Sequence, residues 1–207
     1  MNSVIIPTCK RLEDVQPLLE ELRLNTPSVK IIATCTSGSA AVNRNIGLSY
    51  MSRNECVVMI DDDVTGFFPG WYDKLVTPLL SDMNIAIIAA RLLRPDGRLA
   101  YMMGENYNLE EHLVNVIEKR VPTACIAFIH EGISFDESFV GSGFEDTDFC
   151  KQFAVRYPKG KFVVNNDVRL IHKNEMKCQK GEYWKKNQSY FVRKWPEEYD
   201  REYGGRR

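Results

Sequence analysis

The sequence predicts an α/β fold in which helices cover both faces of a mostly parallel central sheet that carries a small antiparallel extension. Strand-like and helix-like segments alternate over residues 1–90, and this alternation is typical of parallel strands joined by helical crossovers. The segments 4–6, 56–60 and 85–90 are continuous apolar runs, as expected for strands buried on both faces. The chain of 207 residues shows no internal repeat or linker, so we expect one domain over 1–207.

The first half of the chain supplies most of the predicted sheet. Val4–Ile6 is a β-branched run that stops at Pro7, which predicts a short first strand. Apolar residues recur at helical spacing from Leu12 to Leu24, with Pro17 early in that helix. The same patterns predict a strand over 29–33, a helix over about 40–53, a buried central strand over 56–60, a helix over 71–80 and a buried strand over 85–90.

The second half is less regular. Residues 92–111 have poor periodicity around a Pro-Asp-Gly turn at 95–97, so we expect a hairpin and a mobile loop there. Further on, the sequence predicts a strand over 123–129, a helix over 145–157, and two short strands, 162–164 and 168–171, around Asn165-Asn166-Asp167. The basic, aromatic tail from residue 177 has a helical pattern, and we interpret it as a solvated amphipathic helix, with contact to a membrane surface or an acidic partner as the alternative.

Bulk composition excludes several classes of protein. The formal net charge of −1 argues against a nucleic-acid binder held by bulk charge. The sequence has no apolar run of transmembrane length and does not begin like a signal peptide. Its six scattered cysteines (9, 35, 56, 125, 150 and 178) include no CxxC pair, so we expect reduced thiols in a cytoplasmic protein.

Three adjacent carboxylates, Asp61, Asp62 and Asp63, follow the central strand directly. Ligands of open α/β sheets bind at the carboxyl ends of strands, and adjacent carboxylates repel one another unless a cation lies among them. In an extended segment Asp61 and Asp63 point to the same side and Asp62 to the other. The sequence therefore predicts a metal-bridged phosphate site, with a solvated acidic turn as the alternative.

Three further segments are candidates for function. Glycines precede an acidic helix start at Gly143–Asp148, which suits either helix capping or a carboxylate general base. His172 ends a short apolar run and is a candidate metal ligand, although a lone histidine is more often structural. The small-residue loop at 37–45 opens a helix that could bind an anion on its N–H groups.

Six motifs in order give the chain a family resemblance. They are Val4–Arg11, Ala41–Leu48, Val58–Asp63 followed by Pro69–Trp71, Phe135–Phe139, Gly143–Cys150 and the late His172, with Asn187, Phe191, Lys194 and Trp195 similar to a common closing pattern. In this arrangement the sequence resembles the family 2 nucleotide-sugar glycosyltransferases, which have a Rossmann-like fold called GT-A. The resemblance covers nearly the whole chain.

The resemblance implies an inverting hexosyltransferase that requires Mn²⁺ or Mg²⁺. It would move a sugar from a nucleoside-diphosphate sugar, with a UDP-sugar favoured, to an acceptor hydroxyl, which we expect to belong to a glycan. Residues 1–90 would bind the nucleotide and residues 91–207 the acceptor. The implied metal ligands are Asp63 and His172 with Asp61, which is also the candidate partner of the ribose. The other implied donor-binding residues are Pro7, Thr8, Arg11, Asn43, Asn45 and Asp62. Asp146 resembles the catalytic base and Glu145 its neighbour on the acceptor side.

Two departures from the family concern the nucleotide base. The family commonly has an acidic residue after the second strand, but Ala33–Ser37 contains no carboxylate. The aromatic-Asn pair that usually follows Pro-Thr is Cys9-Lys10 here. A hydroxyl or a backbone group would therefore have to read the base.

Three other functions fit parts of the sequence. Ile60–Thr65 matches the DxDx[TV] pattern of haloacid-dehalogenase-like phosphatases, with Asp61 as nucleophile, but that motif usually lies on the first strand. A nucleotidyltransferase of related architecture usually has a glycine-rich loop after the first strand, and Thr8–Leu12 has no glycine. A binding module without turnover is disfavoured because Asp63 and Asp146 are both present.

Overall fold

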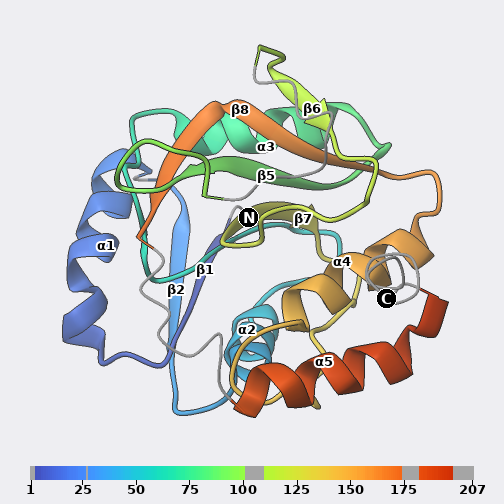
Figure 1. Cartoon of the computed structure of the whole chain (residues 1–207). Coiled ribbons are helices and arrows are strands. Elements are labelled where there is room, and N and C mark those ends of the chain that lie inside the picture. The colour runs from blue at the N-terminus through green and yellow to red at the C-terminus, as the bar shows by residue number, and fades with distance from the viewer. Residues whose placement is uncertain (1–2, 27, 101–109, 174–181, 198–207) are drawn as a thin grey trace.

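The computed structural model describes residues 3–26, 28–100, 110–173 and 182–197, and these form one eight-stranded sheet with five helices (Figure 1). The strands are β1 (Ser3–Thr8), β2 (Lys30–Cys35), β3 (Cys56–Ile60), β4 (Val64–Thr65), β5 (Ile85–Leu93), β6 (Leu113–Asn115), β7 (Cys125–Ile129) and β8 (Lys161–His172). The helices are α1 (Leu12–Asn25), α2 (Ala40–Leu48), α3 (Trp71–Ser81), α4 (Glu145–Arg156) and α5 (Glu182–Lys194).

The strands follow the order β2-β1-β3-β7-β5-β8-β4, and β6 pairs with β8. The pairs β1–β2, β1–β3 and β5–β8 are parallel. The strand β7 runs antiparallel between β3 and β5, and β4 and β6 add antiparallel to β8. Five strands thus run one way, which confirms the mostly parallel α/β sheet. The antiparallel direction of β7 and its place between β3 and β5 were not predicted.

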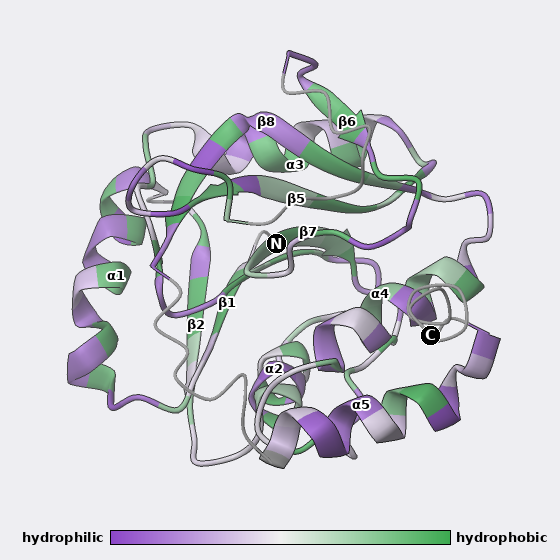
Figure 2. Cartoon of the chain, in the orientation of Figure 1, coloured by the Kyte–Doolittle hydropathy of each residue, from purple (hydrophilic) through white to green (hydrophobic). Residues whose placement is uncertain are grey.

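Helices cover both faces of the sheet because side chains alternate along its buried strands. In β1, Val4 and Ile6 pack in the cluster that contains α1 and α3, whereas Ile5 packs in the cluster that contains α2 and α4. The central strands are accordingly apolar on both sides, and Figure 2 shows them as continuous hydrophobic ribbons between more polar helices. On the first face Trp71 is fully buried, and its indole N–H donates to the Thr26 hydroxyl at 2.8 Å.

Pro7 does not end the first strand as predicted, because β1 continues to Thr8. The Thr8 carbonyl accepts from the Thr36 N–H on the β2 side, so the nitrogen of the preceding Pro7 points toward β3. The β1–β3 ladder has already ended at Ile5–Met59. The missing N–H of Pro7 therefore costs no ladder hydrogen bond.

The two short strands predicted around Asn165-Asn166-Asp167 are one strand, β8, with an irregularity in its middle. Its register against β5 changes from Ala90–Asn165 to Arg91–Arg169. The side chain of Asn165 donates to the Lys74 carbonyl at 2.9 Å, and its oxygen accepts from the Asp167 N–H at 2.9 Å. These hydrogen bonds hold a bulge that sequence periodicity makes look like a turn.

The remaining differences lie at element ends. Helix α2 stops at Leu48, not Arg53, and the short strands β4 and β6 were not predicted. The expected hairpin after β5 is present, with Leu93 and Leu99 paired antiparallel. The expected mobile loop falls largely on 101–109, outside the described residues, as do Cys178 and the first part of the predicted tail helix. None of the helices described has the length and apolar character needed to cross a bilayer.

Helix α5 braces the segment that leads into α4. Asn187 is 1% exposed. Its side-chain oxygen accepts from the Val140 N–H at 3.0 Å, while its amide donates to the carbonyls of Val140 at 2.8 Å and Gly143 at 2.9 Å. Gly143 has φ +106°, and a Cβ there would approach the Trp184 ring of α5 to 3.0 Å. The entry to α4 is therefore shaped by α5.

Candidate active site

Asp61, Asp63 and His172 come together at the carboxyl end of β3. The Asp61 N–H donates to the Ala124 carbonyl at 2.8 Å, which fixes the end of β3 beside the start of β7. His172, the last residue of β8, is paired with Val64 of β4 and so lies beside the acidic turn. One ligand atom from each of the three side chains lies within 4.8 Å of the other two. The sequence placed these residues in one site, and the fold brings them together.

This set of donors fits a hard divalent cation. It offers two carboxylates and one imidazole, which suit Mn²⁺ or Mg²⁺. With their ligand atoms within 4.8 Å of one another, these three side chains would hold such an ion together. Asp63 is 8% and His172 3% exposed, which leaves Asp61 as the most accessible of the three side chains.

The electrostatics of this cluster favour a cation. Burial raises the pKa of Asp61, an effect that the positive charge of Arg44 opposes and the negative charge of Asp63 reinforces. His172 lies 3.0 Å from Asp63 (Nε2 to Oδ1). Burial alone would lower the pKa of His172, but the hydrogen bond and the charge of Asp63 raise it overall. A proton on His172 supplies positive charge that a metal ion would supply instead.

Asp62 lies outside this cluster and has other partners, although residues 61–64 form a turn closed by the Val64 N–H on the Asp61 carbonyl and not the extended segment that we expected. It accepts a hydrogen bond from the Thr8 hydroxyl and pairs with the Lys10 ammonium at 3.0 Å. Asp62 thus ties the end of β3 to the end of β1. The predicted donor residues Thr8 and Asp62 are neighbours in space at the carboxyl edge of the sheet, and Lys10 joins them.

Arg44 connects the acidic turn to α4 and was not singled out from the sequence. Its guanidinium lies 3.0 Å from Asp61 (Nη2 to Oδ1) and 2.7 Å from Glu145 (Nη1 to Oε1). Arg44 is 5% and Glu145 4% exposed. The signal in the sequence was its position, because Arg44 lies on the same helix stripe as the buried Ala41 and Leu48, and a charge on an apolar stripe needs a buried partner.

The buried ion pair between Arg44 and Glu145 goes with shifted pKa values of both side chains. Burial raises the pKa of Glu145, and Arg44 opposes that effect without cancelling it. Burial would lower the pKa of Arg44, but the charges of Asp61 and Glu145 raise it overall. The Nε of Arg44 and the Oε2 of Glu145 are buried without a hydrogen-bond partner. The guanidinium also lies 5.1 Å from the ring centre of Phe135.

Asp146 is the next residue of α4 and is more accessible than Glu145. Its Oδ2 accepts from the Thr123 hydroxyl at 3.2 Å, and its Oδ1 from the Thr147 N–H at 2.7 Å. Thr123 directly precedes Ala124, whose carbonyl binds Asp61. The predicted base is therefore positioned against the same strand start that positions the acidic turn.

The other predicted donor-binding side chains are bound to the protein itself. Asn43 hydrogen-bonds the Thr36 hydroxyl at 2.5 Å and the Gly38 carbonyl at 3.3 Å. Asn45 exchanges two hydrogen bonds of 2.8 Å with the backbone of Phe135. Both amides hold α2 to neighbouring loops, which is a positioning task that the sequence did not suggest.

Two predicted residues lie at the edge of this region. Arg11 precedes α1, and its largely exposed side chain pairs with Asp14 at 3.1 Å. Pro7 is buried near the end of β1. The structure thus clusters Asp61, Asp63, His172, Asp146 and Glu145, places Thr8 and Asp62 next to them, and leaves Arg11 on the surface.

No protein-family model and no curated protein sequence matches this chain. Its fold is similar to several solved structures. A structure of GalNAc-T7 with UDP, GalNAc and Mn²⁺ matches with a TM-score of 0.64 and 15% identity, over 97% of this chain and 49% of that one. This chain therefore spans about half the length of GalNAc-T7.

Two further structures match over most of both chains. A mutant Drosophila β1,4-galactosyltransferase 7, in complex with manganese, UDP-Gal and xylobiose, gives a TM-score of 0.56 and 14% identity over 89% of this chain and 77% of that one. Glucosyl-3-phosphoglycerate synthase from Mycobacterium tuberculosis, in complex with Mn²⁺, UDP-glucose and phosphoglyceric acid, gives a TM-score of 0.54 and 13% identity over 93% of this chain and 79% of that one. Membership of family 2 stays a prediction. From the shared architecture we conclude that this chain has the fold of the GT-A glycosyltransferases.

Proposed function

We propose that this protein is an inverting glycosyltransferase that depends on Mn²⁺ or Mg²⁺ and uses a nucleoside-diphosphate sugar, with UDP-sugars favoured. The observation that supports this most directly is the cluster of Asp61, Asp63 and His172 at the carboxyl edge of a GT-A sheet. The similar structures named above carry Mn²⁺ together with UDP or a UDP-sugar. Family 2 membership, a single domain over 1–207 and a cytoplasmic location are proposed from the sequence.

The three clustered side chains would hold the cation, and each has a distinct environment. When bound, a divalent cation neutralises the charge that develops on a diphosphate leaving group. Asp63 and His172 are buried and mutually oriented, so we assign them as its fixed ligands. Asp61 keeps one oxygen on Arg44, which leaves its other oxygen for the cation or the donor.

The nucleotide would lie toward β1 and β2, where the ends of the two strands expose polar groups. Thr8, Lys10 and Asp62 form the wall of this region nearest the metal cluster. No carboxylate follows β2, and the Thr36 hydroxyl there is held by Asn43. We therefore propose that backbone groups of the 36–39 loop hydrogen-bond the nucleotide base. Asn43 and Asn45 would not contact the donor but would hold α2 and its neighbouring loops in position.

Asp146 would act as the general base. It would take the proton of the acceptor hydroxyl as the oxygen attacks the anomeric carbon, while the bond to the diphosphate breaks on the opposite face. One base suffices because this attack inverts the anomeric carbon without a covalent sugar–enzyme intermediate. Glu145 is less suited because its carboxylate is buried and paired with Arg44. Residues 91–207 would supply the acceptor-binding half, and the acceptor is proposed to be a glycan hydroxyl.

No specific observation in the described part of the structure supports the phosphatase or the nucleotidyltransferase alternative. The phosphatase motif would lie on the first strand, whereas here the acidic turn follows β3, after two strand–helix units. The loop between β1 and α1 contains no glycine that could wrap a triphosphate.

The test is nucleotide release from a panel of UDP-, GDP- and dTDP-sugars, in Mn²⁺ and in EDTA, with proton NMR to assign the anomer formed. We expect one nucleotide to be released only with metal and the product anomer to be inverted. Asp146→Asn should lower turnover by about 10²- to 10⁴-fold while Mn²⁺-dependent donor binding persists. Asp73→Asn is the matched control, because Asp73 also lies in the first turn of a helix, α3. Full turnover by Asp146→Asn would rule out this base.

A further inference from the structure

Arg91 and Arg169 lie side by side near the carboxyl ends of two neighbouring parallel strands. They are register partners in the β5–β8 pair, directly after the β8 irregularity, and Figure 1 shows these two strands side by side. Register partners of a parallel pair project to the same face of the sheet, and neighbouring strands are about 4.8 Å apart. The fold therefore places two permanent positive charges next to each other.

Neither guanidinium has an acidic partner within the part of the chain that the structure describes. The Nε of Arg91 is buried and has no hydrogen-bond partner. Arg169 is exposed, and its Nε donates to the Asn166 carbonyl at 3.0 Å. By contrast, Arg44 and Arg98 each pair with a carboxylate at 3.0 Å or less. Two adjacent like charges repel each other unless an anion lies between them.

The arginine pair shares a sheet end with the candidate active site and projects toward the face that α2 and α4 cover. Met59 of β3 is the register partner of Ile126 of β7, which is in turn the partner of Ala89 of β5. Extending these two registers by two residues toward the carboxyl end of β3 gives the row Asp61, Ala124 and Arg91, and the Asp61 N–H does donate to the Ala124 carbonyl.

Two strand spacings therefore separate Asp61 from Arg91, a distance of roughly 10 Å. Ala89 packs in the cluster that contains α2 and α4, so Arg91 projects toward that side. The proposed base Asp146 lies on α4 and binds Thr123, beside Ala124.

From this arrangement we infer that Arg91 and Arg169 form a binding site for a carboxylate or phosphate group of the acceptor. The inference rests on the proposed function for the identity of the acceptor side. The donor nucleotide is assigned to the β1–β2 side of Asp61, whereas Arg91 and Arg169 lie on the other side, beyond β7 in the strand order. Guanidinium groups present parallel N–H donors that match the two oxygens of such anions. The acceptor is thus an acidic molecule, such as a uronate-bearing or phosphorylated glycan.

Inorganic phosphate is a suitable probe for this site. It is titrated into the protein saturated with Mn²⁺ and UDP, so that the metal cluster is already filled, and separately into protein in EDTA. We expect wild-type protein to bind phosphate in both conditions. Arg91→Ala and Arg169→Ala should each weaken this binding by about 10- to 100-fold, the range expected for losing a charged hydrogen bond, and leave Mn²⁺-dependent UDP affinity within about twofold.

Arg98→Ala is the matched control, because Arg98 follows the same strand β5 and pairs with the exposed Asp96. Arg91→Lys keeps the positive charge but loses the paired N–H donors of the guanidinium, so it should give an intermediate loss of phosphate affinity. Arg169 is exposed, so its variant reports on the site even if Arg91→Ala does not fold.

Unchanged phosphate binding in Arg169→Ala, or no phosphate binding by the wild type, would overturn the inference. An equal loss of UDP affinity in the arginine variants would also overturn it, by assigning the pair to the donor diphosphate. If wild-type protein binds phosphate through these arginines in EDTA but never binds UDP, the proposed function fails while the anion site stands.

Discussion

Replacing Arg44 by methionine removes the cation that joins the acidic turn to α4. Methionine fills a similar volume, so the change acts mainly on charge. Both partners then lose their positive neighbour while they remain at least partly buried, with side-chain exposures of 29% for Asp61 and 5% for Glu145. Removing one partner of a buried ion pair costs about 3–5 kcal/mol, against about 0–1 kcal/mol for a surface pair.

We therefore expect Arg44→Met to lower the free energy of unfolding by about 3–5 kcal/mol, measured by urea denaturation followed by circular dichroism in EDTA. Arg11→Met is the matched control, because Arg11 also pairs with a carboxylate, Asp14, but on the surface. Its loss should stay below about 1 kcal/mol. EDTA keeps any bound metal from adding to the stability of either protein.

The pH dependence of this loss identifies its cause. Burial already raises the pKa of Glu145, and without Arg44 only a backbone hydrogen bond at Glu145 opposes that rise, which the charge of Asp146 reinforces. In the variant, Glu145 takes up a proton in the folded state before it does in the unfolded state, whose carboxyl titrates near pH 4.3. The cost of the buried charge is therefore fully present above the folded pKa and shrinks as the pH falls toward 4.3.

A second substitution checks the same reasoning. Glu145→Gln in the Arg44→Met background removes the uncompensated charge and should recover part of the lost stability. A loss below 1 kcal/mol for Arg44→Met, or a loss that does not change between pH 7.5 and pH 4.5, would refute the account of this bridge.

Two further substitutions probe how α5 supports the site. Asn187→Ala should lower the free energy of unfolding by about 1–3 kcal/mol, because buried groups of Val140 and Gly143 lose their hydrogen-bond partner. Thermal melts measure this loss, with Asn84→Ala, whose side chain is exposed, as the control. Equal stability of the two variants would contradict a stabilising role of Asn187. Burial would raise the pKa of Asp136, but hydrogen bonds from Lys194, the Ser138 N–H and Tyr190 hold it well below its usual range. The stability that Asp136 contributes is accordingly present above about pH 4 and lost as the pH falls further, so the unfolding curves of Asp136→Asn and the wild type should differ at pH 7 and converge in acid, whereas a constant difference would contradict this.

Local patterns in the sequence were sufficient for much of the fold. The apolar run 56–60 and the carboxylates that follow it specified both the central strand and the edge at which a ligand would bind, because burial on both faces demands an unbroken apolar segment. Helices α1 and α3 could also be predicted, because each buries one side against the sheet and therefore repeats its apolar residues at helical spacing. The position of β7 between β3 and β5 was not visible, because strand order depends on contacts between segments far apart in the chain.

The site shows the same division. Asp61, Asp63, His172 and Asp146 were singled out by their residue types and their places at element ends, and the structure brings the first three together. Their roles, which the family resemblance suggests, stay predictions. The bridge through Arg44 joins residues 101 positions apart, and no local pattern specifies such a pair. Asn43 and Asn45 were assigned to the donor, yet their amides bind Thr36 and Phe135. The sequence does not show whether the amide of an asparagine near a loop hydrogen-bonds the protein itself or a ligand.

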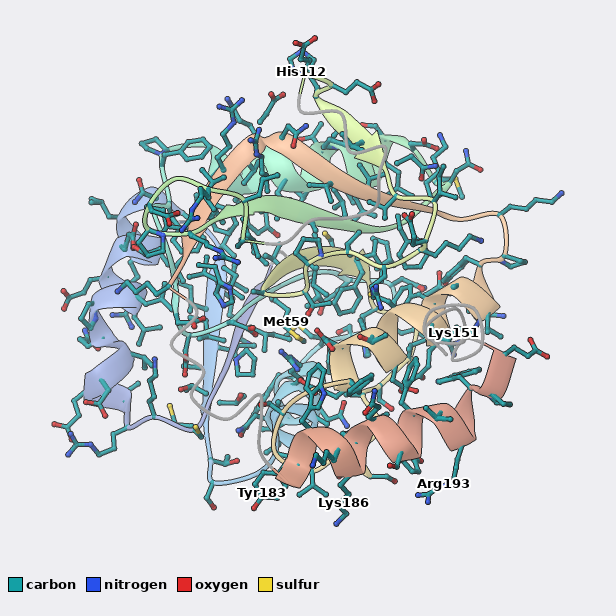
Figure 3. The ribbon with its side chains drawn as sticks, in the orientation of Figure 1. Met59, His112, Lys151, Tyr183, Lys186 and Arg193 are labelled. Carbon is teal, nitrogen blue, oxygen red and sulfur yellow. The ribbon has the colours of Figure 1, made fainter. Side chains whose placement is uncertain are left out.

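Manganese-dependent binding of UDP tests the central claim most directly, with His172→Ala compared against His112→Ala by calorimetry. The two histidines are matched, since His172 lies 3.0 Å from Asp63 and His112 lies 2.9 Å from Asp167. His112 is at the periphery beside β6, whereas Met59 of β3, two residues before the acidic turn, lies in the interior (Figure 3). We expect wild-type and His112→Ala proteins to bind UDP with Mn²⁺ and not with EDTA, and His172→Ala to bind at least about tenfold more weakly with Mn²⁺. Equal UDP affinity in Mn²⁺ and EDTA, or an unchanged affinity in His172→Ala, would contradict a metal-dependent donor site at the end of β3.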